Sequence, residues 1–292
     1  MSLRYGYVSN GLTEHRLDDA LCLLSDSGYD GIALTLDHIH FDPYSRALGL
    51  RAAELRNTLD ELGLTCVIET GGRFVLHRRR KHYPSLISKE RGRRIDLLRR
   101  AVDIAVQLHA PVVSLWSGAK PEDVEQEAAW QRLLESLELV VAHAEERGTM
   151  LGFEPEPGML VETLADFERL RRELGRPSAL GLTLDLGHCV CLEDEPVESS
   201  IRRLADQLVH VHADDMRRGV HEHLMFGEGE LDVAAAMRAL AEIEFEGMVA
   251  VELSRSSHRA HETVPASISV MRAAEKAKPA EPAQPQPVRV MS

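Results

Sequence analysis

The sequence predicts an α/β fold, a single (β/α)8 barrel, from three observations. Short apolar runs rich in β-branched residues alternate with longer segments of helical periodicity. This alternation occurs eight times along 292 residues, which is typical of a (β/α)8 barrel. A doubly wound sheet is the alternative, but it needs a glycine-rich phosphate loop after its first strand, and the turn SNGLTEHR holds a single glycine.

Each expected strand is a short apolar run between turn residues. The runs span residues 5–9, 31–36, 65–69, 111–116, 150–154, 179–185, 208–214 and 247–253. Between the strands, apolar residues recur at helical spacing. Examples are Leu17, Leu21 and Leu24, then Ile95, Leu98, Val102 and Ala105, then Leu134, Leu137 and Val141.

The ends of the expected helices carry recognisable signals. A glycine precedes the next strand in four places, where it can end a helix: Gly28, Gly63, Gly148 and Gly175. Thr163 and Asp166 form the pattern of a capping box, and Asp232 is expected to cap the helix that follows it.

The last residues differ in character from the rest of the chain. The segment KAKPAEPAQPQPVRVMS holds four prolines and almost no apolar pattern, so we expect a disordered tail over residues 276–292. Residues 1–275 have the length of one barrel and leave no room for a second domain.

Composition excludes several classes of partner. The chain has 34 Lys+Arg and 47 Asp+Glu, a net charge of −13, so an acidic surface should repel nucleic acid and anionic membranes. We find no apolar run of 18 residues, no stretch like a signal peptide and, among four cysteines, no paired C-x-x-C spacing. We therefore expect a cytoplasmic protein.

Polar residues follow four consecutive strands at the end where barrel enzymes place their active sites. In the last strand Val249, Val251 and Leu253 must face the helices, so the alternation of a strand turns Glu252 into the barrel mouth. The same parity applies to three residues on the preceding strands: Glu154, Asp185 and His212.

Three carboxylates in a barrel mouth require a compensating cation to stay ionised together. Oxygen ligands with one imidazole suit Mn²⁺ or Mg²⁺ first, then Co²⁺, Fe²⁺ or Zn²⁺. Each residue taken alone is more simply explained as a solvated or arginine-paired side chain. Their convergence on one spot favours a metal site.

At these positions the chain resembles the xylose isomerase-like barrels, the sugar-phosphate isomerase/epimerase group that includes ketose 3-epimerases, hydroxypyruvate isomerase and inosose dehydratase. The resemblance covers about residues 4–274 and lies in the order and spacing of the motifs LTLDLGH, HVHADD, GEGELD and the VEL of the last strand.

The resemblance implies roles for individual residues. Glu154, Asp185, His212 and Glu252 match metal ligands, and Glu154 and Glu252 also match the acid/base pair on opposite faces of the substrate. His188 resembles a histidine that contacts a substrate oxygen. Either Arg217 or Arg218 matches an arginine that holds the reactive oxygens, and the sequence does not choose between them.

The implied function is a divalent-metal isomerase or epimerase of a small keto sugar, polyol or sugar phosphate. A dehydratase on the same site is the alternative. An abasic-site endonuclease fits less well because of the charge and an incomplete three-zinc ligand set, and a barrel that only binds a metabolite is a fourth reading. A homodimer is expected from the resemblance alone.

Several further residues have two readings. Glu69 is either substrate-binding or structural, and Trp116 is either a sugar-stacking platform or a core filler. The basic run from Arg78 to Lys81 either captures an anion or is solvated. His221 and His223 either hold a second metal or belong to a surface lid loop. The helix arginines, including Arg94, are expected to be solvated.

Overall fold

A computed structural model describes residues 2–277 and contains a closed barrel of eight parallel strands, as predicted. Around the barrel the strand order is β1-β10-β7-β6-β5-β4-β3-β2. The barrel strands are β1 (Arg4–Val8), β2 (Gly31–Thr35), β3 (Thr65–Glu69), β4 (Val112–Leu115), β5 (Met150–Phe153), β6 (Leu180–Asp185), β7 (Leu208–Ala213) and β10 (Met248–Val251).

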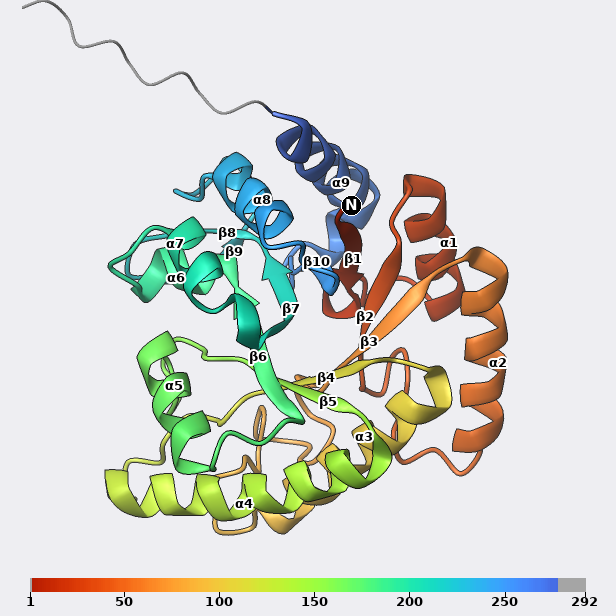
Figure 1. Ribbon diagram of the computed structural model, residues 1–292. Helices are drawn as coiled ribbons and strands as arrows, with labels where there is room; N and C mark the ends of the chain where they lie inside the picture. The colour runs from red at the N-terminus through yellow and green to blue at the C-terminus, as the bar shows by residue number, and fades with distance from the viewer. Residues whose placement is uncertain (1, 278–292) are drawn as a thin grey trace, which may run out of the picture.

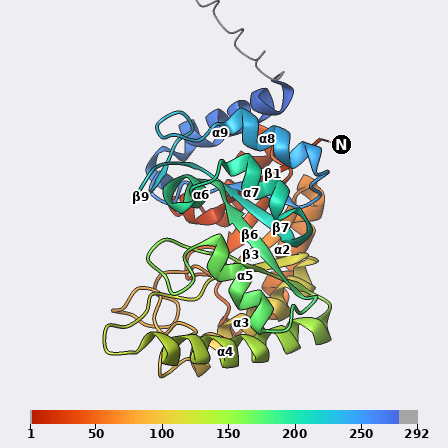
Figure 2. The same cartoon turned by 60° about the vertical axis from the view of Figure 1, so that its left-hand side comes forward.

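The helices form an outer layer around the strands (Figure 1). They are α1 (Leu17–Ser27), α2 (Leu48–Leu62), α3 (Gly92–Leu108), α4 (Gln126–Arg147), α5 (Leu164–Glu173), α6 (Leu186–Leu192), α7 (Val197–Arg203), α8 (Val233–Glu242) and α9 (Ala260–Lys276). Helix α9 contacts both α8 and α1, so the outer layer of helices closes into a ring. The turned view in Figure 2 shows α8 and α9 together at one end of the molecule.

Local signals act as the sequence predicts. Gly28, Gly63 and Gly148 have positive φ and end α1, α2 and α4. Thr163 and Asp166 form both hydrogen bonds of a capping box, and the Asp232 side chain accepts from the backbone N–H of Ala235.

Three details differ from the prediction. Two helices, α6 and α7, lie between β6 and β7 where one is expected, and the residues after β7 form a hairpin of β8 (Asp215–Arg217) and β9 (Val220–Leu224). Helix α9 runs to Lys276, so the expected tail begins no earlier than residue 277. Its residues from 278 onward lie outside the described part of the chain.

No helix among residues 2–277 has the length and apolarity needed to cross a membrane.

The barrel interior sets the direction of the polar residues at its mouth. Val67 and Ala250 belong to a buried cluster inside the barrel, together with Val8, Ala33, Val112 and Met248. Because side chains alternate along a strand, Glu69 and Glu252 lie two residues further along on the same inward face. This apolar layer therefore fills the barrel interior beneath the mouth. The carboxylates lie beyond it, at the carboxyl ends of the strands.

Candidate metal centre

A cavity of about 480 Å³ lies at the mouth of the barrel. Its wall includes Glu69, Trp116, Glu154, His212 and Glu252, which lie at or directly after the carboxyl ends of β3, β4, β5, β7 and β10, and His188 from α6, which follows β6. This is the end at which barrel enzymes place their active sites.

The structure brings four of the predicted residues together, and we call them the mouth cluster: Glu154, Asp185, His212 and Glu252. One candidate ligand atom from each lies within 4.8 Å of the others. Strand pairing causes this convergence, because Asp185 pairs with His212 across β6 and β7, and the backbone N–H of Glu252 donates to Ala213 O on β7.

His212 is the centre of the mouth cluster. Its Nδ1 lies 3.0 Å from Glu154 Oε1 and 3.0 Å from Glu252 Oε2, while its Nε2 lies 3.0 Å from Glu69 Oε1. Nδ1 therefore faces the carboxylates of the cluster, and Nε2 faces a fourth carboxylate outside it. In metal sites this second contact typically fixes the tautomer and orientation of a ligating histidine.

The pKa values show how crowded the charges are. Burial raises the pKa of Glu154, with the Glu252 charge adding to the effect and His212 opposing it. Burial alone would lower the pKa of His212, but Glu154, Glu69 and Glu252 raise it well above its ordinary value. The pKa of Glu252 lies well below its ordinary value, because His212, His223 and Asn10 together outweigh its burial.

Asp185 has an oxygen without a partner. Its Oδ1 accepts from the backbone N–H of His188 at 2.8 Å and caps α6, whereas its Oδ2 is buried and makes no hydrogen bond. An orphaned carboxylate oxygen is costly in a buried site. Because Asp185 Oδ2 belongs to a set of three carboxylates and one imidazole, the residues present fit a divalent cation.

Sequence reasoning did not single out Glu156. This residue lines the cavity, and burial raises the pKa of its carboxyl well above the ordinary value, with the charges of Glu154 and Glu252 adding to the effect. Its signal in the sequence is its position, two residues after Glu154.

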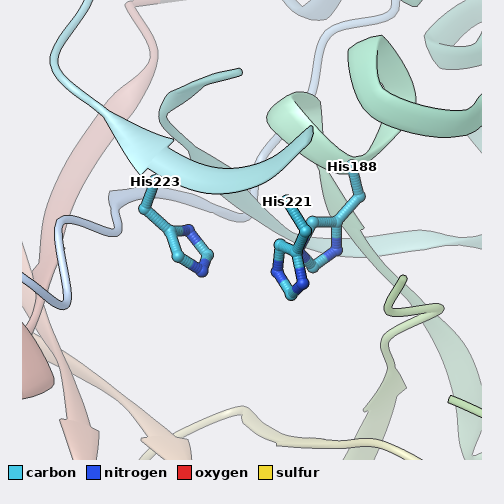
Figure 3. A group of neighbouring side chains, drawn as sticks. All are labelled: His188, His221 and His223. Atoms are coloured by element: carbon cyan, nitrogen blue, oxygen red, sulfur yellow. The ribbon is translucent and has the colours of Figure 1, made fainter. Parts of the chain in front are cut away.

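His188, His221 and His223 form a second group at the mouth, here called the histidine trio (Figure 3). His188 extends from α6, whereas His221 and His223 extend from β9. Burial, with His188 and His223, lowers the pKa of His221 to about 4. His223 contacts Asp214 through Nδ1, and this carboxylate, with Glu252, offsets its burial and raises its pKa to about 10.

Trp116 and Glu69 both line the cavity, and they make different contacts. Trp116 is 7% exposed, and its ring lies 4.9 Å from that of His82, so it both fills space and lines the cavity. Glu69 contacts His212 and also lies 3.3 Å from His210 Nε2.

The structure does not bring Arg217 or Arg218 into the cavity. Arg217 donates to Glu228 O, whereas Arg218 pairs with Asp194, and both are exposed at the β8–β9 hairpin. Of the basic run, only Lys81 lines the cavity. Two further cations at its wall, Arg73 and Arg255, were not singled out from the sequence.

The expectation that Arg94 is solvated is wrong. This side chain is 3% exposed and donates to three backbone carbonyls, those of Thr70, His82 and Pro84. Its guanidinium lies 4.8 Å from the centre of the Trp116 ring. Arg94 therefore holds the loop after β3 against the wall of the cavity, and burial lowers its pKa to about 10, which leaves it charged at neutral pH.

The fold and the mouth cluster define a (β/α)8-barrel protein with a candidate metal site at the carboxyl ends of its strands. The chain belongs to the xylose isomerase-like TIM barrel family, whose sequence model matches residues 21–274.

Relatives of the chain include sugar epimerases and dehydratases. The chain is 26% identical to a fructoselysine 3-epimerase from Shigella flexneri over 82% of its own length and 84% of the relative's. It is 28% identical to an inosose dehydratase from Geobacillus kaustophilus over 46% of its own length and 49% of the relative's.

Solved structures show the same fold. A D-allulose 3-epimerase from Methylomonas sp. matches with a TM-score of 0.74 at 16% identity, covering 94% of this chain and 98% of that one. An L-ribulose 3-epimerase matches with a TM-score of 0.73 at 21% identity, covering 93% of this chain and 92% of that one.

Proposed function

We propose that the protein is a divalent-metal-dependent isomerase or epimerase of a small keto sugar, polyol or sugar phosphate. The observation that carries this proposal is the mouth cluster itself, in which Asp185 Oδ2 is buried without a partner among two further carboxylates and an imidazole. The 3-epimerase among its relatives supports the same chemistry.

The mouth cluster would hold the cation, with Mn²⁺ first among the candidates and Mg²⁺, Co²⁺, Fe²⁺ and Zn²⁺ after it. When bound, the cation lowers the cost of negative charge on the carbonyl and hydroxyl oxygens of the substrate. Glu69 would keep His212 oriented for this role. Its Oε1 lies 3.0 Å from Nε2 of His212 and would accept the proton on that nitrogen.

Glu154 and Glu252 would move the proton. They follow β5 and β10, which are separated in the barrel by β6 and β7, and so they approach the cavity from different sides. One carboxylate removes the proton next to the substrate carbonyl, and the other delivers a proton to the opposite face, which inverts that carbon. Delivery of the proton to the former carbonyl carbon on the same face, with a proton passing from the hydroxyl oxygen to the former carbonyl oxygen, would instead give an aldose–ketose isomerisation.

Residues of the cavity wall outside the mouth cluster would bind the substrate. His188 presents Nε2 near the mouth cluster, 3.8 Å from Asp185 Oδ2, and suits a substrate oxygen. Trp116 offers an apolar face for a sugar ring. The arginines Arg217 and Arg218 have no part in this proposal, because neither lines the cavity.

A dehydratase on the same site is the second candidate, and the inosose dehydratase relative supports it. The same proton removal followed by loss of a neighbouring hydroxyl would give an unsaturated product. Ultraviolet absorbance of such a product separates this reaction from epimerisation.

The test is solvent exchange. The protein is dialysed against a chelator, Mn²⁺ is added back, and deuterium from the solvent is followed into a panel of ketoses and ketose phosphates. We expect exchange only after the metal is restored. Absence of exchange with every substrate, together with no bound metal in elemental analysis, would contradict the proposal.

A further inference from the structure

Three exposed cations line the outer part of the cavity, and we call them the rim cations: Arg73, Lys81 and Arg255. Arg73 reaches from the loop after β3 to the loop after β10, where its Nη2 donates to Ser254 O at 3.3 Å, next to Arg255. Lys81 precedes His82, whose backbone N–H donates to Arg73 O at 2.7 Å. The rim cations therefore come from adjoining segments of backbone.

The rim cations belong to a basic part of an acidic chain. The loop between β3 and α3, residues 70–91, holds seven Lys+Arg and one Asp+Glu, although the whole chain has a net charge of −13. Burial, and then the charges of Lys81 and Arg94, lower the pKa of His82 in this loop to about 4. Positive charge is thus gathered beside a cavity whose buried end is acidic.

The rim cations make few contacts with carboxylates. Of the three, Arg255 alone forms an ion pair among residues 2–277, with Glu222 at 3.2 Å, and both partners are so exposed that the pair contributes little. Asp37 also lines the cavity, but its Oδ1 already accepts from the backbone N–H groups of Ile39 and His40, each at 2.8 Å. Charged donors without an acceptor in a concave site suit an anionic ligand.

The loop that carries Arg73 and Lys81 is held in place by a buried side chain. Arg94 donates to Thr70 O at 3.2 Å and to His82 O at 3.2 Å. These two carbonyls flank the segment that holds both rim cations of this loop. Because the backbone is fixed before a ligand arrives, less ordering is needed on binding.

We propose that the substrate carries a phosphate ester at the end away from its reacting carbonyl, and that the rim cations bind this phosphate. The inference rests on the proposed function, in which the mouth cluster acts on the reacting end of the substrate in the same cavity. A phosphate monoester carries about −1.5 to −2 charges at neutral pH. A guanidinium group can pair with two of its oxygens at once, and an ammonium group adds a point charge.

The other arginines of the loop have a lesser part in this proposal. Arg78, Arg79 and Arg80 are exposed, and none of them lines the cavity. They would raise the local concentration of an anionic substrate without contacting it when it is bound. The site would thereby select ketose phosphates over free ketoses and polyols.

The test is calorimetric binding of two probes to the Mn²⁺-loaded protein: D-glucitol and its terminal phosphate ester, which have no carbonyl and cannot react. We expect the phosphate ester to bind at least about 10-fold more tightly, because charged hydrogen bonds are added. Arg73→Met combined with Lys81→Met should remove this preference. Arg79→Met, at an exposed arginine of the same loop, should keep it. Equal preference in the Arg73/Lys81 double variant and the unmodified chain would overturn the proposal.

A second double variant, Glu154→Gln with Glu252→Gln, shows whether the phosphate binds at the rim or at the mouth cluster. A phosphate held by the rim cations should still be preferred in this variant, and loss of the preference would overturn the proposal. D-Gluconate, which carries a carboxylate in place of the phosphate, should bind to this variant less tightly than the phosphate ester. The reverse order would overturn the choice of phosphate.

Solvent exchange separates this inference from the proposed function. In the unmodified chain we expect a lower KM for ketose phosphates than for free ketoses, and the Arg73/Lys81 double variant should raise the KM for ketose phosphates more than it lowers kcat. Exchange into free ketoses and ketose phosphates with equal KM would overturn the inference and leave the proposed function standing. A rim-dependent phosphate preference without exchange in any substrate would support the phosphate site and contradict the proposed function.

Discussion

Nε2 of His212 lies 3.0 Å from Oε1 of Glu69, on the side of the ring opposite the mouth cluster. Glu69 ends β3, on the far side of the barrel from β7. The contact therefore spans the barrel interior and leaves Nδ1 of His212 facing Glu154 and Glu252. This relationship makes Glu69 a candidate positioning residue for the proposed metal site.

Glu69→Gln should weaken metal binding without removing a ligand. The amide cannot match the carboxylate as an acceptor for the His212 proton, so we expect a 10- to 100-fold loss of Mn²⁺ affinity, measured by calorimetric titration. Glu135→Gln, at a carboxylate that is 60% exposed, is the matched control. Unchanged affinity in Glu69→Gln would show that the contact is only structural.

Glu154→Gln and Glu252→Gln should each stop proton transfer. Removal of a general acid or base typically lowers the rate by about 10² to 10⁴. Solvent deuterium uptake measures this loss directly, and thermal unfolding checks that each variant folds. Full exchange in either variant would remove that residue from the proposed acid/base pair.

Arg94→Met should destabilise the fold by about 2 to 3 kcal/mol, because three backbone carbonyls, two of them buried, lose a charged donor. Urea unfolding measures the difference. Arg99→Met, at an exposed arginine on the same helix, should change stability by less than about 0.5 kcal/mol. Equal stability of the two variants would contradict the role given to Arg94.

His82 should make the protein sensitive to acid. Burial, with the charges of Lys81 and Arg94, lowers its pKa to about 4, whereas the unfolded chain has the ordinary value of about 6.5. Between these values the unfolded state binds more protons at His82, so the contribution of His82 to stability is constant above pH 6.5 and falls as the pH drops toward 4.

At pH 4.5 this shift corresponds to about 2 to 3 kcal/mol of lost stability relative to pH 7. His82→Asn removes the titrating group and suits the positive φ of 57° at this position. The variant should lose correspondingly less stability on acidification in urea unfolding. An identical loss in both proteins would assign the acid sensitivity to other groups.

The sequence predicted the barrel well because its signals are local and repeated. Apolar runs, helix-ending glycines and the capping box at Thr163 each depend on nearby residues. The inward direction of Glu252 followed from the alternation of one strand, since Ala250 on the same face is inside the barrel.

The site was less predictable where it depends on loops and long-range contacts. The burial of Arg94 depends on carbonyls in the loop after β3, which periodicity does not reveal. The directions of Arg217 and Arg218 depend on the β8–β9 hairpin, whose first strand has only three residues and gives no clear pattern. Glu156 was missed because it lies beyond the end of β5, in a loop where the alternation of a strand no longer predicts the direction of a side chain.

The proposed function requires Glu154, Asp185, His212 and Glu252 to hold a divalent cation. Anomalous scattering from crystals grown with Mn²⁺ tests it most directly. We expect an anomalous peak within coordination distance of all four side chains. A protein that is active with Mn²⁺ yet shows its anomalous peak elsewhere, with none at these four residues, would contradict it.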